Sequence, residues 1–399
     1  MLTKLQLVKY AKVLIWGLET ARTKPYKPYD TVLIRYHLEA APLAEYLFRE
    51  LIQKKLNVIP RCLNTPVMEH DFYSFTDSKQ RKFIAAGEQE FYGKLAGNIF
   101  LNAPSSLTHL KDIDSKKIND VMVTRKKLRE IMIKREENGD FGWTLCTLPT
   151  EELAKKAKLS LKAYTNQVVK ACFLNDKNPV SKWKQVYKES VEIKKWLNSL
   201  GIKTIHVESK SMDLEILFGE KRKFIGISGH NIPSFEIFTS PDWRGTRGTF
   251  YADQPSFRNG NYVEKIKLLF EKGRAVKISA GKGENFVKNT LTMDKGASQV
   301  GEFSLTDKRF SKIDAFMADT LFDENYGGKF GNCHIAVGSS YSDTYSGNVK
   351  NLNKVMKKSL GYNDSALHWD LVNTEDKIVT ATLKSGKKQV IYEGGMFKY

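Results

Sequence analysis

The stretch Thr31-Val-Leu-Ile-Arg-Tyr36 has the apolar, β-branched character of a buried strand, and it begins the pattern that decides the fold. Residues 38–56 follow with a leucine at every fourth position, which is typical of an amphipathic helix: Leu43, Leu47 and Leu51. Asn57-Val-Ile-Pro60 is strand-like again. A strand, a helix and a second strand in this order predict a βαβ unit, which implies a parallel sheet.

The same alternation continues through the first half of the chain. Helical spacing over Lys79 to Leu95 precedes the strand Asn98-Ile-Phe-Leu101. Helical spacing over Thr124 to Glu136 precedes the strand Trp143-Thr-Leu-Cys146. Residues 150–200 are then predicted to be almost wholly helical, so the first part of the chain has the pattern of an α/β domain.

The second half has a different pattern. Short strands with turn residues between them follow one another closely, at Ile202 to Val207, Asp213 to Phe218, Arg222 to Ile227, Ile378 to Leu383 and Gln389 to Tyr392. Helices are expected at Tyr262 to Glu271 and Val349 to Leu360. At 399 residues the chain exceeds the usual size of one domain. We therefore expect an α/β N-terminal domain with a mainly parallel sheet over residues 1–200, followed by a β-rich α+β domain over residues 201–399.

The composition limits the kinds of molecule that the protein is expected to bind. The formal net charge is +19, but the lysines are spread along the whole chain and often lie close to acids, which favours solvated faces over a groove that follows phosphates. The four cysteines form no CxxC pair, so neither a thiolate zinc site nor a disulfide framework is expected. Neither a signal peptide nor a membrane span is recognised, and we expect a cytoplasmic protein that binds neither membrane nor nucleic acid.

Acids and histidines of the second half lie inside or beside short apolar segments instead of in the lysine-rich surface sequence. They are Glu236, Glu302, Glu324, His334, His368 and Asp370. Burying an ionised carboxylate in an apolar medium costs on the order of tens of kcal/mol unless it is paired or metal-bound. The placement of these residues therefore predicts a site for divalent cations.

Most of these residues alone also fit a structural role, whereas Glu236 is more suggestive because acids rarely lie inside a run as apolar as Phe235-Glu-Ile-Phe238. His368 and Asp370 share one face of a predicted strand, and an isolated His-x-Asp pair is more often an ordinary hydrogen-bonded pair. His334 fits a buried histidine with satisfied hydrogen bonds, Glu302 an exposed edge residue and Glu324 a turn. As a set, carboxylates and imidazoles suit zinc, cobalt or manganese, and they are too many for one catalytic zinc.

Five motifs in this order resemble the M29 family of metallopeptidases, the thermophilic-type aminopeptidases. They are Asn231-Ile-Pro-Ser-Phe-Glu-Ile-Phe-Thr-Ser-Pro241, Gly301-Glu302, Asp323-Glu-Asn325, His334-Ile-Ala-Val-Gly338 with Tyr341, and Leu367-His-Trp-Asp370. The resemblance extends into the first half through Asp30-Thr-Val-Leu-Ile-Arg35 and Glu39-Ala-Ala-Pro-Leu43.

The resemblance implies a metalloaminopeptidase that cleaves the N-terminal residue from peptides with a free N-terminus and works as a homodimer. Residues 201–399 would then form the metal-binding catalytic domain. It also implies two divalent ions per chain, of zinc, cobalt, manganese or magnesium. Glu302 would bridge the ions and Tyr341 would stabilise the transition state. The ligands would be Glu236, Glu302, Glu324, His334, His368 and Asp370.

Two competing interpretations remain open at this point. The net charge and the aromatic content also fit a basic nucleic-acid-binding protein whose acids and histidines are structural, although no zinc-finger spacing or RNP-like segment is present. Gly281-Lys-Gly-Glu-Asn-Phe286 begins like a dinucleotide fingerprint. It lacks the third glycine and precedes no clear βαβ unit, which favours an exposed turn over a nucleotide site.

Overall fold

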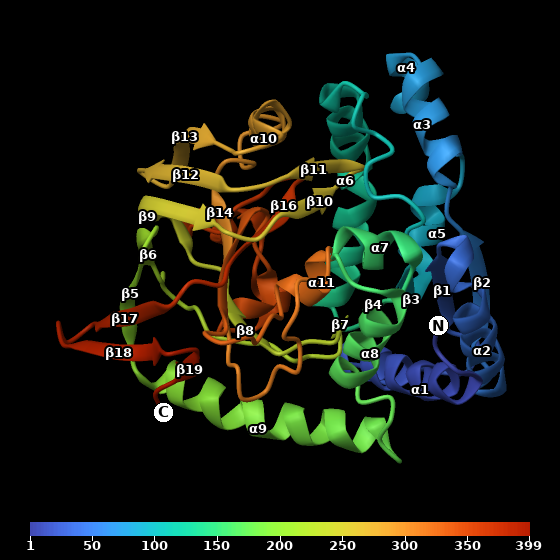
Figure 1. Cartoon of the computed structure of the whole chain (residues 1–399), viewed down its shortest axis with the longest axis horizontal. Coiled ribbons are helices and arrows are strands. Elements are labelled where there is room, and N and C mark those ends of the chain that lie inside the picture. Colours follow the sequence, from blue (N-terminus) through green and yellow to red (C-terminus); the bar gives the residue numbers. More distant parts are fainter. The chain divides into compact units, whose positions relative to one another are not determined.

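The fold is described from a computed structural model that covers all 399 residues (Figure 1). The chain forms two compact units. Unit 1 comprises Met1–Tyr187, Ile227–Ser234 and Met317–Leu321. Unit 2 comprises Lys188–Gly226, Phe235–Phe316 and Phe322–Tyr399. The main division therefore falls at residues 187 and 188, and two short segments of the second half belong to unit 1.

Unit 1 is built on a five-stranded sheet with the order β2-β1-β3-β4-β7, in which all neighbouring strands are parallel. The strands are β1 (Thr31–Tyr36), β2 (Asn57–Cys62), β3 (Leu95–Asn102), β4 (Gly142–Thr147) and β7 (Asn231–Ile232). The order reverses direction at β1, because β2 adds on one side of it and β3 on the other. The predicted α/β character and parallel sheet of the N-terminal part are therefore confirmed.

Helices precede, connect and follow these strands along the chain. They are α1 (Lys4–Thr20), α2 (Ala41–Gln53), α3 (Pro66–Phe75), α4 (Ser78–Arg81), α5 (Glu88–Lys94), α6 (Ser115–Glu137), α7 (Glu151–Lys156) and α8 (Leu161–Ala171). The first begins at a capping box, in which the Thr3 hydroxyl accepts from the Gln6 amide and the Gln6 side chain accepts from the Thr3 amide. Helix α9 (Pro179–Ser199) carries the chain from unit 1 into unit 2.

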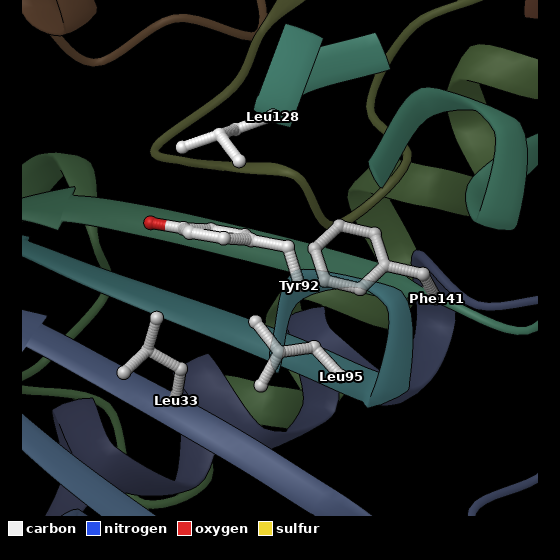
Figure 2. Packing of buried hydrophobic residues seen from close by; sticks show 5 residues of the cluster. All are labelled: Leu33, Tyr92, Leu95, Leu128 and Phe141. Atoms are coloured by element: carbon white, nitrogen blue, oxygen red, sulfur yellow. The ribbon is translucent and has the colours of Figure 1, made fainter. Parts of the chain in front are cut away.

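One hydrophobic cluster fixes α5 and α6 on the sheet of unit 1 (Figure 2). Leu33 of β1 and Leu95 of β3 lie below the ring of Tyr92, and Leu128 of α6 approaches the ring from above. Phe141 closes the cluster beside β4. Hydrogen bonds to Asp319 link the carboxyl ends of β3 and β4. The Asp319 carboxylate accepts from Thr147 Oγ1 at 3.1 Å and from Asn102 Nδ2 at 2.9 Å.

Unit 2 is rich in antiparallel strands, as expected for the C-terminal part. Its larger sheet has the order β13-β12-β9-β6-β5-β17-β18-β19 and its smaller one β16-β15-β14-β8, beside the β10-β11 hairpin. The larger sheet contains β5 (Ile202–Ser209), β6 (Asp213–Leu217), β9 (Asp242–Ala252), β12 (Ile266–Glu271), β13 (Arg274–Ser279), β17 (Lys377–Leu383), β18 (Lys388–Glu393) and β19 (Met396–Phe397). The smaller sheet contains β8 (Glu236–Thr239), β14 (Val300–Thr306), β15 (Asn332–Gly338) and β16 (His368–Asn373), and the hairpin pairs β10 (Ser256–Arg258) with β11 (Asn261–Val263).

Short helices complete unit 2. They are α10 (Glu284–Leu291), α11 (Thr320–Asp323, which begins in the segment assigned to unit 1) and α12 (Lys354–Ser359). None of the helices in the chain combines the length and the apolar character that crossing a bilayer requires.

Several expected elements differ from the structure. The helix predicted at Tyr262 to Glu271 is wrong, because this segment forms β11 and β12, and the buried residues of β12 alternate. Lys79 to Leu95 is interrupted around Gly87, which has a left-handed backbone with φ of 80°. Arg222 to Ile227 makes only isolated bridges to Tyr345 and Phe238 instead of a strand. In Val349 to Leu360 only the α12 part is α-helical, after a 3₁₀ turn.

Candidate functional site

The candidate site lies on one face of the smaller sheet of unit 2. Strand pairing places Glu302 of β14 opposite Ala336 of β15, and Ala336 opposite Asp370 of β16. Residues paired directly across antiparallel strands project from the same face, as do residues two positions apart on one strand. Ser304, His334 and His368 therefore share this face with the Glu302–Asp370 row.

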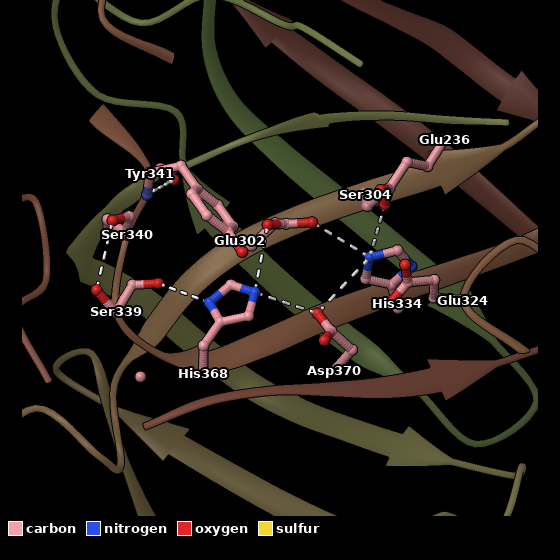
Figure 3. Close-up of polar contacts among 12 residues, drawn as sticks. Glu236, Glu302, Ser304, Glu324, His334, Ser339, Ser340, Tyr341, His368 and Asp370 are labelled. Atoms are coloured by element: carbon pink, nitrogen blue, oxygen red, sulfur yellow. Dashed lines mark hydrogen bonds and ion pairs between the residues drawn. The ribbon is translucent and has the colours of Figure 1, made fainter. Parts of the chain in front are cut away.

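The small side chain of Ala336 shapes the centre of the site. Glu302 and Asp370 stand on strands that are two strand spacings apart, which is about 10 Å. Between Glu302 and Asp370, the only side chain is the methyl group of Ala336. The longer side chains of the neighbouring rows can therefore converge above Ala336, and Figure 3 shows them pointing toward one another.

The imidazole of His334 is the centre of one group of ligand atoms. Its Nε2 lies 3.1 Å from Glu236 Oε2 and 3.3 Å from Glu302 Oε1. His368 is the centre of a second group, with its Nε2 3.6 Å from Glu302 Oε2 and 3.4 Å from Asp370 Oδ1. Within each group the candidate ligand atoms lie within 4.8 Å of one another. Glu302 belongs to both groups and turns a different oxygen toward each imidazole (Figure 3).

Glu236, Glu302 and His334 of this cluster are shielded from solvent, and Asp370 is partly exposed. His334 has no exposed surface, and Glu302 and Glu236 expose only 3% and 5%. Strands β14 and β15 are buried along their whole length, so the polar face of the sheet is covered as well as its apolar face. Such burial makes uncompensated negative charge costly, and the cluster therefore favours added positive charge.

The pKa values of the cluster follow from this balance. Burial raises the pKa of Glu302 to about 7, with Glu236 and Asp370 contributing and the hydrogen bond from His334 opposing. Burial lowers the pKa of His334, but its hydrogen bonds to Glu236 and Glu302 outweigh this effect and bring the pKa to about 10. Burial would raise the pKa of Asp370, yet His368 and His334 lower it to about 2.

Supporting hydrogen bonds fix the orientation of several cluster side chains. Ser304 Oγ donates to Glu236 Oε2 at 3.1 Å. His368 Nδ1 lies 2.8 Å from the Ser339 carbonyl, which leaves Nε2 facing the acids. Arg258 donates to the backbone carbonyl of His368 at 2.8 Å. Sequence reasoning did not single out Ser304, although the polar residues Glu302, Ser304 and Thr306 alternate with apolar ones along β14.

Tyr341 lies at the edge of the cluster with its hydroxyl toward Glu302 (Figure 3). Its ring packs edge-on against His368 at a centroid distance of 4.7 Å, and its amide donates to Ser240 Oγ at 2.8 Å. Burial and then the charges of nearby acids raise the pKa of the Tyr341 hydroxyl well above its ordinary value. The hydroxyl therefore stays protonated near neutral pH and can donate a hydrogen bond.

Glu324 lies outside both groups of ligand atoms. It follows α11 in a loop, is 6% exposed, and appears beside His334 in Figure 3. Its charge is among those that raise the pKa of Tyr341, so it is close to the cluster. Five of the six residues predicted as ligands are therefore brought into two overlapping groups, and the sixth borders them.

The donor set fits divalent cations. Carboxylate oxygens and imidazole nitrogens are ligands for zinc, cobalt, manganese and similar ions, and the cluster contains no cysteine. Ligands that come from four adjacent strands are held rigidly, which suits a preformed metal site.

Comparison with known sequences agrees with this chemistry. A family model described as Thermophilic metalloprotease (M29) matches residues 3–397. The chain is 26% identical to Aminopeptidase AmpS of Bacillus subtilis (strain 168), over 84% of this chain and 82% of that protein. It is also 26% identical to Aminopeptidase 2 of Geobacillus stearothermophilus, over 94% of each chain.

The fold also has a counterpart among solved structures. Wild-type AmpT from Thermus thermophilus superposes with a TM-score of 0.78, and the match covers 98% of this chain and 99% of that one. The sequence identity is 18%, so this likeness is a likeness of fold. It supports the architecture of an α/β N-terminal part followed by a β-rich part.

Proposed function

Because the chain belongs to the thermophilic metalloprotease family M29, we propose that it is an aminopeptidase that uses two divalent metal ions per chain. The family resemblance expected from the five motifs is confirmed, and the chain is a metal-dependent hydrolase that acts on peptide bonds. The N-terminal specificity, the number of ions and the roles of single residues are the proposal.

The observation that carries the proposal is the position of Glu302 between two imidazoles. One carboxylate oxygen faces His334 and the other faces His368, which is the arrangement expected of a bridging carboxylate. We assign Glu236 and His334 to one ion, His368 and Asp370 to the other, and Glu302 to both. Two divalent cations carry four positive charges, which equals the negative charge of the four acids Glu236, Glu302, Glu324 and Asp370.

When bound, such ions would lower the pKa of water toward neutrality and polarise the scissile carbonyl. The residues around them have separate tasks. Tyr341 donates a hydrogen bond to the oxyanion that forms at the carbonyl, since its raised pKa keeps it protonated. Ser304 holds the carboxylate of Glu236 in its orientation. Glu324 is the sixth ligand or holds the charged terminus of the peptide, and its position beside His334 is compatible with either role (Figure 3).

Restriction to the N-terminal residue is supported by the relatives, since the matched proteins of B. subtilis and G. stearothermophilus are both named aminopeptidases. The substrate class would then be peptides with a free N-terminus. The rival interpretation as a nucleic-acid-binding protein is not favoured, because the family match spans nearly the whole chain. A homodimer and a cytoplasmic location remain proposals, and light scattering of the purified protein tests the first.

The test is hydrolysis of leucyl chromogenic amides by the purified protein. We expect activity that is lost on exhaustive chelation and restored by cobalt or zinc, with about two ions per chain at full activity. An N-acetylated leucyl amide is the matched control and should not be cleaved. Full activity after chelation would contradict the metal-dependent proposal, and full activity with one ion per chain would contradict its two-ion part.

A further inference from the structure

A second group of charged side chains belongs to unit 1, and its charge is positive. Arg35 is on β1 two residues after Leu33, so it projects from the face of the sheet that α5 and α6 cover. Its Nε is buried and has no hydrogen-bond partner. Its guanidinium carbon lies 5.2 Å from the centroid of the Phe100 ring, and no carboxylate forms an ion pair with it. A half-buried charge of this kind lacks a counter-ion.

The neighbouring strand adds more positive charge. Arg61 of β2 is paired in register with Arg35, so the two side chains stand side by side on one face. The Arg61 guanidinium lies 5.0 Å from the ring centroid of Phe91 and 3.4 Å from Glu88. Burial lowers the pKa of Arg35; Tyr92 opposes this shift, and the positive charges of Arg61 and of the exposed Arg125 on α6 add to it. Three guanidinium groups thus lie near one another, with Glu88 as the one acid paired among them.

The place of this group in the sheet is also informative. In open parallel sheets, ligands bind beyond the carboxyl ends of the strands at the point where the strand order reverses. Here the order reverses between β1 and β3. Arg35 is the last residue but one of β1, and Phe100 is near the carboxyl end of β3. Figure 2 shows the Tyr92 hydroxyl turned toward the same ends of the strands.

We propose that Arg35 and Arg61 form a binding site for an oxyanion, the phosphate or carboxylate group of a small molecule, at the carboxyl edge of the parallel sheet. A guanidinium presents a planar fork of donors that matches two oxygens of such a group. Phe91 and Phe100 hold the planes of the two guanidinium groups by their ring faces. The site goes beyond the proposed peptidase function and does not depend on it.

Isothermal titration calorimetry of the full-length protein tests the site, with inorganic phosphate and acetate as probes at constant ionic strength. We expect saturable binding of at least one probe, and the probe that binds more tightly identifies the oxyanion. Arg35→Gln should weaken this binding by tenfold or more. Arg35→Lys should weaken it severalfold, because the charge remains but the planar fork is lost. Arg49→Gln, which removes an exposed arginine of unit 1, should bind as the wild type does.

Two further measurements distinguish binding at Arg35 from binding elsewhere on the protein. Phosphate can also bind to metal ions, so the titration is repeated with His334→Ala, in which binding at Arg35 should persist. Should Arg35→Gln fail to fold, Arg61→Gln provides the same comparison on the neighbouring strand. The proposal is overturned if neither probe binds saturably to the wild type, or if binding is unchanged in Arg35→Gln and Arg61→Gln.

Discussion

The smaller sheet of unit 2 and the parallel sheet of unit 1 both carry clusters of charged side chains that are partly or fully buried, but the two clusters differ in the sign of their charge and in how far that charge is compensated. In unit 2, acids and imidazoles converge from four antiparallel strands onto two centres that share Glu302. In unit 1, Arg35 and Arg61 stand side by side, and Glu88 is the one acid paired with them. Each cluster therefore has an excess of charge of one sign. We infer that each excess marks the binding site of an ion of the opposite sign.

The largest effect is expected from Glu302→Gln, which removes the carboxylate shared by both centres. An amide cannot supply two charged oxygens, so both ions should be lost together, and peptidase activity should fall by more than about 10³-fold. Metal content of the isolated variant and the rate of leucyl amide hydrolysis measure this. Glu271→Gln, at the exposed end of β12, is the control. Retention of one ion with partial activity would show that Glu302 does not bridge.

Tyr341→Phe should lower kcat by about 10²–10³-fold, the usual cost of losing one donor to an oxyanion. Its metal content should stay at the wild-type level, because the hydroxyl is proposed to contact substrate and not the ions. Tyr29→Phe, an exposed tyrosine of unit 1, serves as the control. Loss of metal from Tyr341→Phe would assign the residue to the metal site instead.

Ser304→Ala should weaken metal binding about 10–100-fold, because the variant leaves Glu236 without the donor that orients it. Competition with a chromogenic chelator measures the affinity. Ser385→Ala, in the exposed turn between β17 and β18, should not change it. Unchanged affinity in Ser304→Ala would mean that strand geometry alone positions Glu236.

The smallest effect concerns a partly buried cation of unit 2, Lys194 of α9. Its Nζ donates to the Gly226 carbonyl at 2.8 Å, and burial lowers its pKa to about 8. Arginine keeps its proton at all accessible pH values, whereas lysine can lose it and so relieve the cost of burial. Between pH 8 and 10.5 the unfolded chain therefore holds a proton that the folded protein has released, and stability rises with pH across this window.

Relative to Lys194→Met, the wild type should gain at most about 3 kcal/mol between pH 8 and 10.5. Urea unfolding of both proteins at several pH values measures the difference. A constant difference across this range would contradict the lowered pKa. Such a result would show that Lys194 stays charged in the folded protein because its hydrogen bonds compensate for its burial.

The elements that the sequence predicted best are those whose apolar runs end at clear turn residues. The strand Thr31 to Tyr36 matches the structure closely, and so do the strands Ile378 to Leu383 and Gln389 to Tyr392. The segment Tyr262 to Glu271 has two competing periods, because Ile266 and Phe270 fit both a helical spacing and an alternating one. The segment becomes a strand because β12 pairs with both β9 and β13. A turn at Gly273, with φ of 79°, connects β12 to β13.

The candidate site shows a similar limit. The acids and histidines could be recognised because each contradicts its apolar surroundings. The roles of Ser304 and Ala336 could not, because they arise from the register of β14, β15 and β16, which no local pattern specifies. The arginine group of unit 1 was missed for the same reason, since Arg35 and Arg61 meet only through the pairing of β1 with β2.

The return of two late segments to unit 1 has a consequence for how the protein is made. Asn231 pairs with Leu145 at the edge of the parallel sheet, and Asp319 accepts hydrogen bonds from Asn102 and Thr147. A ribosome that has delivered only the first 187 residues has therefore not yet supplied the edge strand or the carboxylate that fastens β3 to β4. Unit 1 can reach its final form only after most of unit 2 has been synthesised. Folding of the N-terminal half is therefore completed only when residues of the C-terminal half are present.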